Sequence, residues 1–170
     1  LKELPREQVV IATKAMGRVW EGPLGAGLSR KHLREALEAS LRRLQVDYVD
    51  LYQCHAPAPE TSLEETFGTL QDFVRQGKVL HVGVSNYSAT LLADVLATQV
   101  RHGWEPVVSH QPLYNLLDRE IEAELLPRCA QHGIGVIPYS PLAEGLLTGK
   151  YAGGTVPTGS RGERNPHFRR

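Results

Sequence analysis

Polar side chains that could bind or transform a small molecule recur in this chain, each directly after a short apolar run. They are Lys14, His55, Ser85 with Asn86, Gln111 and Tyr139. A lysine can stabilise a nearby anion, and a histidine can hydrogen-bond a substrate oxygen or transfer a proton. Hydroxyl and amide groups carry both donors and acceptors, which suits recognition of a carboxamide. A tyrosine ring can stack on a flat ligand. The set indicates a site for a small organic molecule.

Each of these residues also has an ordinary structural explanation. Lys14 could extend into solvent from a strand end, and His55 could be hydrogen-bonded to backbone. Asn86 could cap a helix, and Tyr139 could fill the core. The functional interpretation gains weight only from the position that these residues share.

The apolar runs that precede these residues have the length and composition of buried strands. They cover residues 9–11, 48–52, 82–84, 107–108 and 136–138, and they alternate with helical patterns. Such alternation predicts a parallel sheet. The carboxyl ends of parallel strands lie on one side of a sheet or barrel, where α/β proteins keep their sites. We therefore expect the six polar residues to be neighbours.

Capping residues mark where three of the helices should begin: Ser29, Ser62 and Ser88. A fourth helix, closed near Gly133, contains Pro127, which should kink it or lie near a break. Three further histidines are expected on the surface or in loops: His102, His110 and His132.

Composition excludes several classes of protein. The 170 residues are 41% hydrophobic and 22% charged, as in an ordinary single globular domain. Nineteen basic residues balance nineteen acidic ones, which argues against a nucleic-acid partner. No run approaches the ~18 apolar residues of a membrane span. Two cysteines indicate a reducing compartment, and no cluster has metal-ligand spacing. We expect a cytoplasmic protein without a metal.

Two familiar nucleotide-binding motifs are also absent. Gly149 and Lys150 resemble part of a phosphate loop, but Glu144 and Tyr151 stand where that loop needs glycine and serine or threonine. No G-x-G-x-x-G sequence occurs, so a Rossmann dinucleotide site is not supported.

Two architectures fit the alternating pattern: an open doubly wound sheet and a (β/α)8 barrel. A barrel needs eight strands and roughly 250 residues, whereas five strands are visible here. Length alone therefore favours the open sheet.

Five segments of the chain resemble the aldo-keto reductases, in the same order and at compatible spacing. They are IATK, DYVDLYQCHAP, GKVLHVGVSN, QPLYN and GIGVIPYSPLAEGLLTGKY. The similarity extends over nearly all 170 residues and is greatest to the bacterial and potassium-channel β-subunit-like branches. It implies a (β/α)8 barrel that binds NADPH and reduces an aldehyde or ketone, a small-molecule carbonyl substrate. Hydride passes from the nicotinamide while a tyrosine donates the proton.

The resemblance also implies a role for each candidate residue. Lys14 matches the lysine that lowers the pKa of the catalytic tyrosine, and His55 matches the histidine that orients and polarises the carbonyl. The matches for carboxamide binding are Ser85, Asn86 and Gln111, and the match for stacking on the nicotinamide is Tyr139. Contacts to the pyrophosphate and adenosine would come from Ser140, Pro141, Leu142, Ala143, Lys150 and Arg161. Residues 153–170 would form a mobile loop over the cofactor.

Other parts of the family pattern have no match in these residues. The catalytic Asp and Tyr of the family lie upstream of its lysine strand, and its last strand and helix follow the cofactor loop. We therefore expect residues 1–170 to be a single incomplete domain, a partial (β/α)8 TIM barrel of about five βα units. Such a fragment should be inactive alone.

Two other functions remain open at this point. The chain could be a nucleotide-binding regulatory subunit or inactive truncated reductase, which loss of the family's Asp and Tyr would favour. It could also be an open-sheet α/β protein with an unrelated small ligand. The oligomeric state is not predicted.

Overall fold

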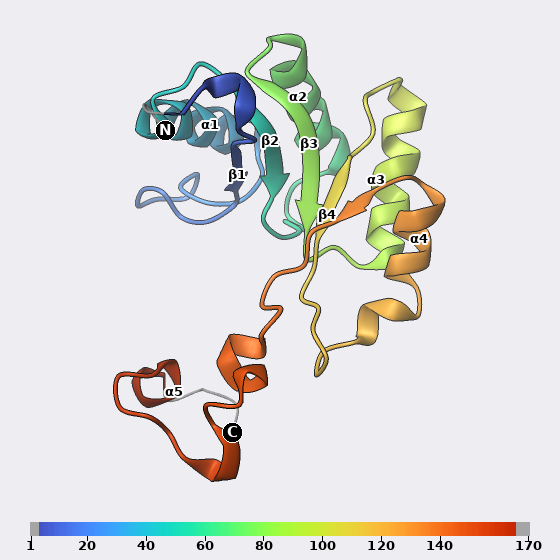
Figure 1. Cartoon of the computed structure of the whole chain (residues 1–170). Coiled ribbons are helices and arrows are strands. Elements are labelled where there is room, and N and C mark those ends of the chain that lie inside the picture. Colours follow the sequence, from blue (N-terminus) through green and yellow to red (C-terminus); the bar gives the residue numbers. More distant parts are fainter. Residues whose placement is uncertain (1–3, 166–170) are drawn as a thin grey trace.

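The computed structural model describes residues 4–165 as one parallel sheet with helices (Figure 1). The strands are β1 (Ala12–Ala15), β2 (Val49–Cys54), β3 (Val79–Ser85), β4 (Ser109–Gln111) and β5 (Gly135–Val136). The α-helices are α1 (Arg30–Leu44), α2 (Leu63–Arg75), α3 (Ala89–His102), α4 (Leu125–Gln131) and α5 (Arg161–Arg164). Short 3-10 turns are η1 (Arg6–Gln8), η2 (Glu120–Glu122), η3 (Ala143–Thr148) and η4 (Ala152–Gly154). Within this part of the chain, no helix is long and apolar enough to cross a membrane.

The strands pair in parallel in the order β1-β2-β3-β4-β5, which is also their order in the sequence. Because βα crossovers are right-handed, this order places α1 to α4 on the same face of the sheet, as Figure 1 shows. A doubly wound sheet reverses its strand order and carries helices on both faces. The topology is that of consecutive units of a (β/α)8 barrel, and the sheet is not closed. The partial barrel is confirmed.

The three predicted helix caps are confirmed. The side-chain oxygens of Ser29, Ser62 and Ser88 accept hydrogen bonds from backbone N–H groups three residues further on, at 3.3, 3.1 and 3.1 Å. Pro127 lies in the first turn of α4, where a backbone N–H has no acceptor within the helix. The break predicted near this proline lies between η2 and α4.

Two strands lie further along the chain than the apolar runs predicted. Runs at 9–11 and 107–108 lead into β1 and β4, which begin at Ala12 and Ser109. Hydrophobicity marks the approach to each strand, where Ile11 and Val107 are buried and Val10 and Val108 are exposed, but the strand itself is set by pairing to its neighbour. As a result Lys14 and Gln111 belong to strands instead of following them.

The hydrophobic core lies between the sheet and its helices. Tyr52, Val82 and Val84 are buried on the side of the sheet that faces the helices, and the ring of Tyr52 meets the edge of Phe73 at a centroid distance of 6.3 Å. Apolar residues of the helices close this layer: Leu33, Leu37, Phe67, Leu70, Leu92 and Val95. The strand alternation that buries these positions turns every second side chain toward the opposite face.

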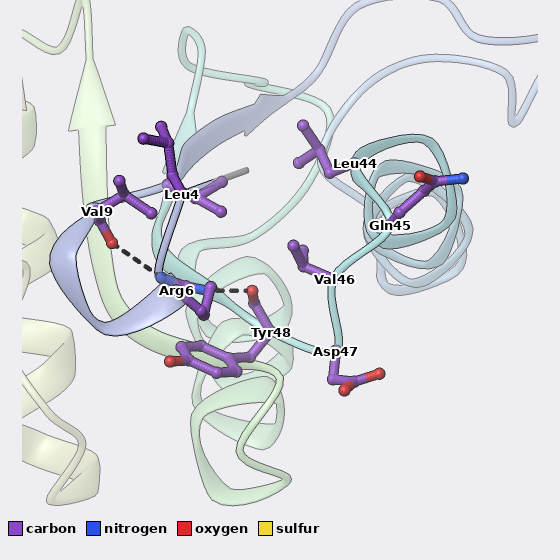
Figure 2. A pocket seen from close by; sticks show the side chains of 9 residues that line it. Leu4, Arg6, Val9, Leu44, Gln45, Val46, Asp47 and Tyr48 are labelled. Atoms are coloured by element: carbon purple, nitrogen blue, oxygen red, sulfur yellow. Dashed lines mark hydrogen bonds between the residues drawn. The ribbon is translucent and has the colours of Figure 1, made fainter. Parts of the chain in front are cut away.

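A hollow of about 280 Å³ lies beside the amino ends of β1 and β2, away from the predicted site (Figure 2). The Arg6 guanidinium lies 4.0 Å above the centre of the Tyr48 ring. It donates to the carbonyl of Val9 at 2.9 Å and to the carboxylate of Asp50 at 2.6 Å. These contacts hold η1 against β2, so the arginine has a structural role here.

Candidate functional site

Five of the six predicted site residues are joined by a continuous series of hydrogen bonds. The ammonium of Lys14 donates to the side-chain oxygen of Gln111. Ser85 Oγ donates to the Gln111 carbonyl at 2.7 Å, and Asn86 Nδ2 donates to Ser85 Oγ at 3.1 Å. Tyr139 Oη donates to Asn86 Oδ1 at 2.9 Å. We call this series the polar network. It links β1, β3, β4 and the segment after β5, as the sequence predicted.

His55, the sixth residue, reaches the polar network through its backbone. Its carbonyl oxygen accepts from Asn86 Nδ2 at 3.0 Å, and its N–H donates to the carbonyl of Ala15 at 2.9 Å. The residue is exposed directly after β2, so its imidazole is accessible to a ligand. The structure thus places His55 at the site, and its role in orienting a carbonyl stays a prediction.

A layer of three residues lies beneath the polar network on the same face of the sheet. Gln53, Gly83 and Ser109 occupy adjacent strands in register. A Cβ on Gly83 would lie 2.3 Å from Ser109 Oγ and 3.1 Å from Gln53 Cγ, so only glycine fits between them. Both neighbouring side chains are buried, and within residues 4–165 neither Gln53 Nε2 nor Ser109 Oγ has a hydrogen-bond partner.

Lys14 carries its charge in a partly enclosed position. Burial lowers the pKa of its ammonium below the usual value. Its polar partner is the neutral amide of Gln111, which compensates the lost hydration less well than a carboxylate would. An ammonium in this position favours a negative charge developing close to it.

The amide groups of the polar network suit a carboxamide ligand in their chemistry. Lys14 occupies the side-chain oxygen of Gln111, which leaves the NH2 group of Gln111 to donate elsewhere. The side-chain oxygen of Asn86 accepts one hydrogen bond, from Tyr139, and has a second lone pair. One donor and one acceptor are what a carboxamide requires. Tyr139 is 37% exposed, so part of its ring remains open for stacking.

The turn that carries Tyr139 and Ser140 is supported by Asn115, which the sequence analysis did not single out. Asn115 Nδ2 donates to the Ser140 carbonyl at 3.1 Å, and Ser140 has a φ of 55°. The backbone N–H of Tyr139 donates to the carbonyl of Pro112 at 2.9 Å. A hollow of about 300 Å³ opens beside this turn, lined in part by Leu113, Asn115, Tyr139, Ser140, Ala143 and Glu144. The QPLYN segment contains Asn115 and was the available signal.

The remaining predicted cofactor residues lie in a small lobe beyond the carboxyl ends of the strands (Figure 1). Pro141 and Leu142 are exposed, while Ala143 is buried. Arg161 forms an ion pair with Glu144 at 3.5 Å, which ties α5 to the turn after Tyr139.

Lys150 lies 5.1 Å from the ring centre of Tyr151 in the same lobe. Residues 153–165 contain short helical turns, and residues 166–170 of the predicted loop lie outside the described residues. Mobility of this loop stays a prediction.

His110 is not a surface or loop residue, contrary to the prediction from sequence. It is fully buried in β4, and its Nε2 lies 3.0 Å from the carbonyl oxygen of Tyr87. Burial lowers the pKa of its imidazole, and the contact with Tyr87 opposes that shift. Strand alternation explains the error, because Gln111 faces the site and its neighbour must face the helices.

The amino-acid sequence is similar to those of known proteins. The family model described as the aldo/keto reductase family matches residues 1–167. The L-glyceraldehyde 3-phosphate reductase of Escherichia coli (strain K12) is 41% identical over 161 residues, which cover 94% of this chain and 46% of the relative. The NADH-specific methylglyoxal reductase of the same strain is 39% identical over 178 residues, covering 96% and 52%.

A third relative is a probable voltage-gated potassium channel subunit beta of Oryza sativa subsp. japonica. It is 40% identical over 159 residues, which cover 92% of this chain and 48% of the relative. The chain spans about half the length of these curated relatives. The family match over nearly every residue, the consecutive parallel βα units and the polar network agree: the chain belongs to the aldo/keto reductase family.

Proposed function

We propose that this chain supplies the nicotinamide site and part of the catalytic group of an NADPH-dependent reductase that converts aldehydes or ketones to alcohols. The observation that carries the proposal is the polar network from Lys14 through Gln111, Ser85 and Asn86 to Tyr139. These residues come from four strand ends, and the family's pattern implies a cofactor or catalytic role for each of them.

The residues of this chain would divide the work as follows. Gln111 and Asn86 bind a carboxamide between a donor and an acceptor, and Tyr139 supports the ring beside it. The cofactor, when bound, supplies the hydride. His55 hydrogen-bonds the substrate oxygen and orients the carbonyl. The ammonium of Lys14 stabilises negative charge that develops near this oxygen.

We further infer that residues 1–170 alone do not reduce carbonyls at the rate of a complete enzyme. A proton donor must reach the substrate oxygen, and neither Tyr52 nor Tyr139 is free to serve as one. Tyr52 is fully buried against Phe73 on the helix-facing side, and the hydroxyl of Tyr139 is bound to Asn86.

Cofactor titration tests the binding part of this proposal. The natural-length protein that contains this chain would be titrated with NADPH and with NADH, and binding followed by nucleotide fluorescence. We expect Tyr139→Ala to weaken NADPH binding about tenfold, since a stacking ring contributes about 1–3 kcal/mol. Tyr139→Phe should retain most of the affinity. Tyr114→Ala is the matched control, because that hydroxyl serves Glu122 at 2.7 Å.

Turnover tests the catalytic part. With NADPH and a reactive aldehyde, the natural-length protein should consume the cofactor, whereas the 170 residues alone should not. Robust turnover by the 170 residues would refute their predicted inactivity. Preference for NADH, as the name of one relative states, would correct the cofactor assignment and leave the reductase assignment intact.

A regulatory subunit that senses nicotinamide nucleotides is the second candidate. The similarity to a probable potassium channel subunit beta favours it. Tight NADPH binding without turnover in the natural-length protein would support this candidate. We also propose a reducing, cytoplasmic location, which the free and buried thiols of Cys54 and Cys129 support.

A further inference from the structure

Tyr87, which follows the site residues Ser85 and Asn86, is anchored on the helix-facing side of the sheet at two points. Its backbone carbonyl lies 3.0 Å from Nε2 of His110. Its hydroxyl interacts with the thiol of Cys54, whose pKa burial raises to about 12. His110 and Cys54 are fully buried, and Tyr87 is 3% exposed.

The chemistry of the first contact defines the protonation of His110. A carbonyl oxygen can only accept a hydrogen bond, so Nε2 carries the proton. Within residues 4–165, the buried Nδ1 has no hydrogen-bond partner. A buried imidazole with one of its two nitrogens unsatisfied is costly compared with an apolar side chain of similar size. Filling the core does not by itself account for a histidine here.

The contact has a direct consequence for the site. Asn86 has a φ of 61°, a left-handed conformation that costs energy for a residue with a side chain, although asparagine tolerates it better than most. On one side of Asn86, Ser85 faces the polar network, and on the other side Tyr87 is fixed in the core. The left-handed turn directs the Asn86 amide to the carbonyl of His55 at 3.0 Å and to the hydroxyl of Tyr139 at 2.9 Å.

We propose that His110 is a positioning residue for the nicotinamide half of the cofactor site. By holding the carbonyl of Tyr87 it keeps the turn at Asn86 in place, and with it the acceptor offered to the carboxamide. His110 touches no ligand itself. The inference rests on the proposed function, because it assumes that the polar network binds a nicotinamide.

The test compares two probes in the natural-length protein: NADPH, and phospho-ADP-ribose, which lacks the nicotinamide. We expect His110→Leu to weaken NADPH binding about tenfold, the effect of losing one well-placed hydrogen bond and the order that it imposes. Binding of phospho-ADP-ribose should be unchanged. His110→Gln should restore NADPH affinity, since its amide nitrogen can donate from a position similar to Nε2. Val82→Ala is the control, because it removes a buried side chain from the same face without touching the turn.

A second variant keeps the test decisive should His110→Leu fail to fold. Tyr87→Phe removes only the hydroxyl that interacts with the Cys54 thiol, and it should weaken NADPH binding in the same selective way, by a smaller factor. Lower thermal stability with unchanged NADPH affinity in both variants would overturn the inference. Equal loss of both probes would overturn it as well. An unaltered protein that binds neither probe would refute the proposed function, and this inference with it.

Discussion

At the scale of single residues, the site is held by side chains that bind one another before they bind a ligand. Asn86 uses its NH2 group on Ser85 and His55 and its oxygen on Tyr139. These bonds restrict the rotamers of the groups that would meet a cofactor. A ligand therefore finds its acceptor already oriented, which lowers the entropy cost of binding.

Substitution of Asn86 separates the backbone contribution from that of the side chain. Asn86→Gly and Asn86→Ala both remove the amide, but only glycine adopts a φ of 61° without strain. We expect the alanine variant to be about 1–2 kcal/mol less stable than the glycine variant in urea unfolding. Both should bind NADPH more weakly than the parent. Equal stability of the two variants would show that the turn relaxes to another conformation.

Lys14 provides the second residue-scale prediction. Lys14→Met keeps the length of the side chain and removes its charge, so it should lower the rate of carbonyl reduction about 100-fold or more. Cofactor affinity should change much less. Steady-state kinetics of the natural-length protein would measure both. Lys31→Met, on the exposed side of α1, is the control and should be neutral. A variant at Lys14 with full activity would remove this residue from the catalytic group.

At the scale of secondary-structure elements, the layer formed by Gln53, Gly83 and Ser109 beneath the polar network permits little change. We expect Gly83→Ala to destabilise the protein by about 1–3 kcal/mol, because the new methyl group would overlap Ser109 Oγ. Adding Ser109→Ala should recover part of this loss, so that the two effects are not additive. Urea unfolding of both single variants and the double variant measures the coupling. If the effects of the two substitutions on stability were strictly additive, the strain would not lie in the contact between residue 83 and Ser109.

The stabilisation provided by the contact between η1 and β2 should be lost at low pH. Burial alone would raise the pKa of Asp50, but the N–H of Ile11 and the guanidinium of Arg6 outweigh it and hold that pKa below its usual 3.8. The stabilisation is therefore fully present above this usual value and is lost as the pH falls through the lower folded-state pKa. We expect Asp50→Asn to reduce stability at neutral pH, and the difference from the parent protein to shrink as the pH falls below 3.8. Asp94→Asn, on the surface of α3, is the control.

The elements that could be predicted from sequence are those with local signals. Helix caps require only a serine and the residues that follow it, and all three were placed correctly. Strand starts were placed less well because they depend on a neighbour: β1 begins where it pairs with β2, after the apolar run has ended.

The candidate site also contains some residues that could be predicted from the sequence and others that could not. Alternation and position at strand ends were sufficient to group Lys14, Gln111 and Tyr139. Asn115 and His110 were missed, because each acts on a backbone carbonyl that the sequence cannot locate. Only the folded chain shows which carbonyl is near, so residues that support others are harder to predict than residues that face a ligand.

At the scale of the whole molecule, the outer strands β1 and β5 each pair with one neighbour within the described residues. Unpaired strand edges promote association between chains. We expect residues 1–170 expressed alone to self-associate, as size-exclusion chromatography with light scattering would show. Ala12→Lys places a charge on the exposed edge strand and should reduce this association. Val100→Lys changes an exposed side chain of α3, away from the strand edges, and should not reduce the association. A monodisperse monomer of the unaltered 170 residues would contradict the prediction.

The bond between Lys14 and Gln111 joins residues 97 positions apart, across β1 to β4. Contacts of such long range form late, since loop closure must be completed before they contribute. The polar network therefore cannot exist in a partly folded chain that lacks β4. We expect cofactor binding to recover after the helices during refolding, and added NADPH to slow unfolding without accelerating folding. The site thus serves as a kinetic reporter that the strands have docked in the correct register.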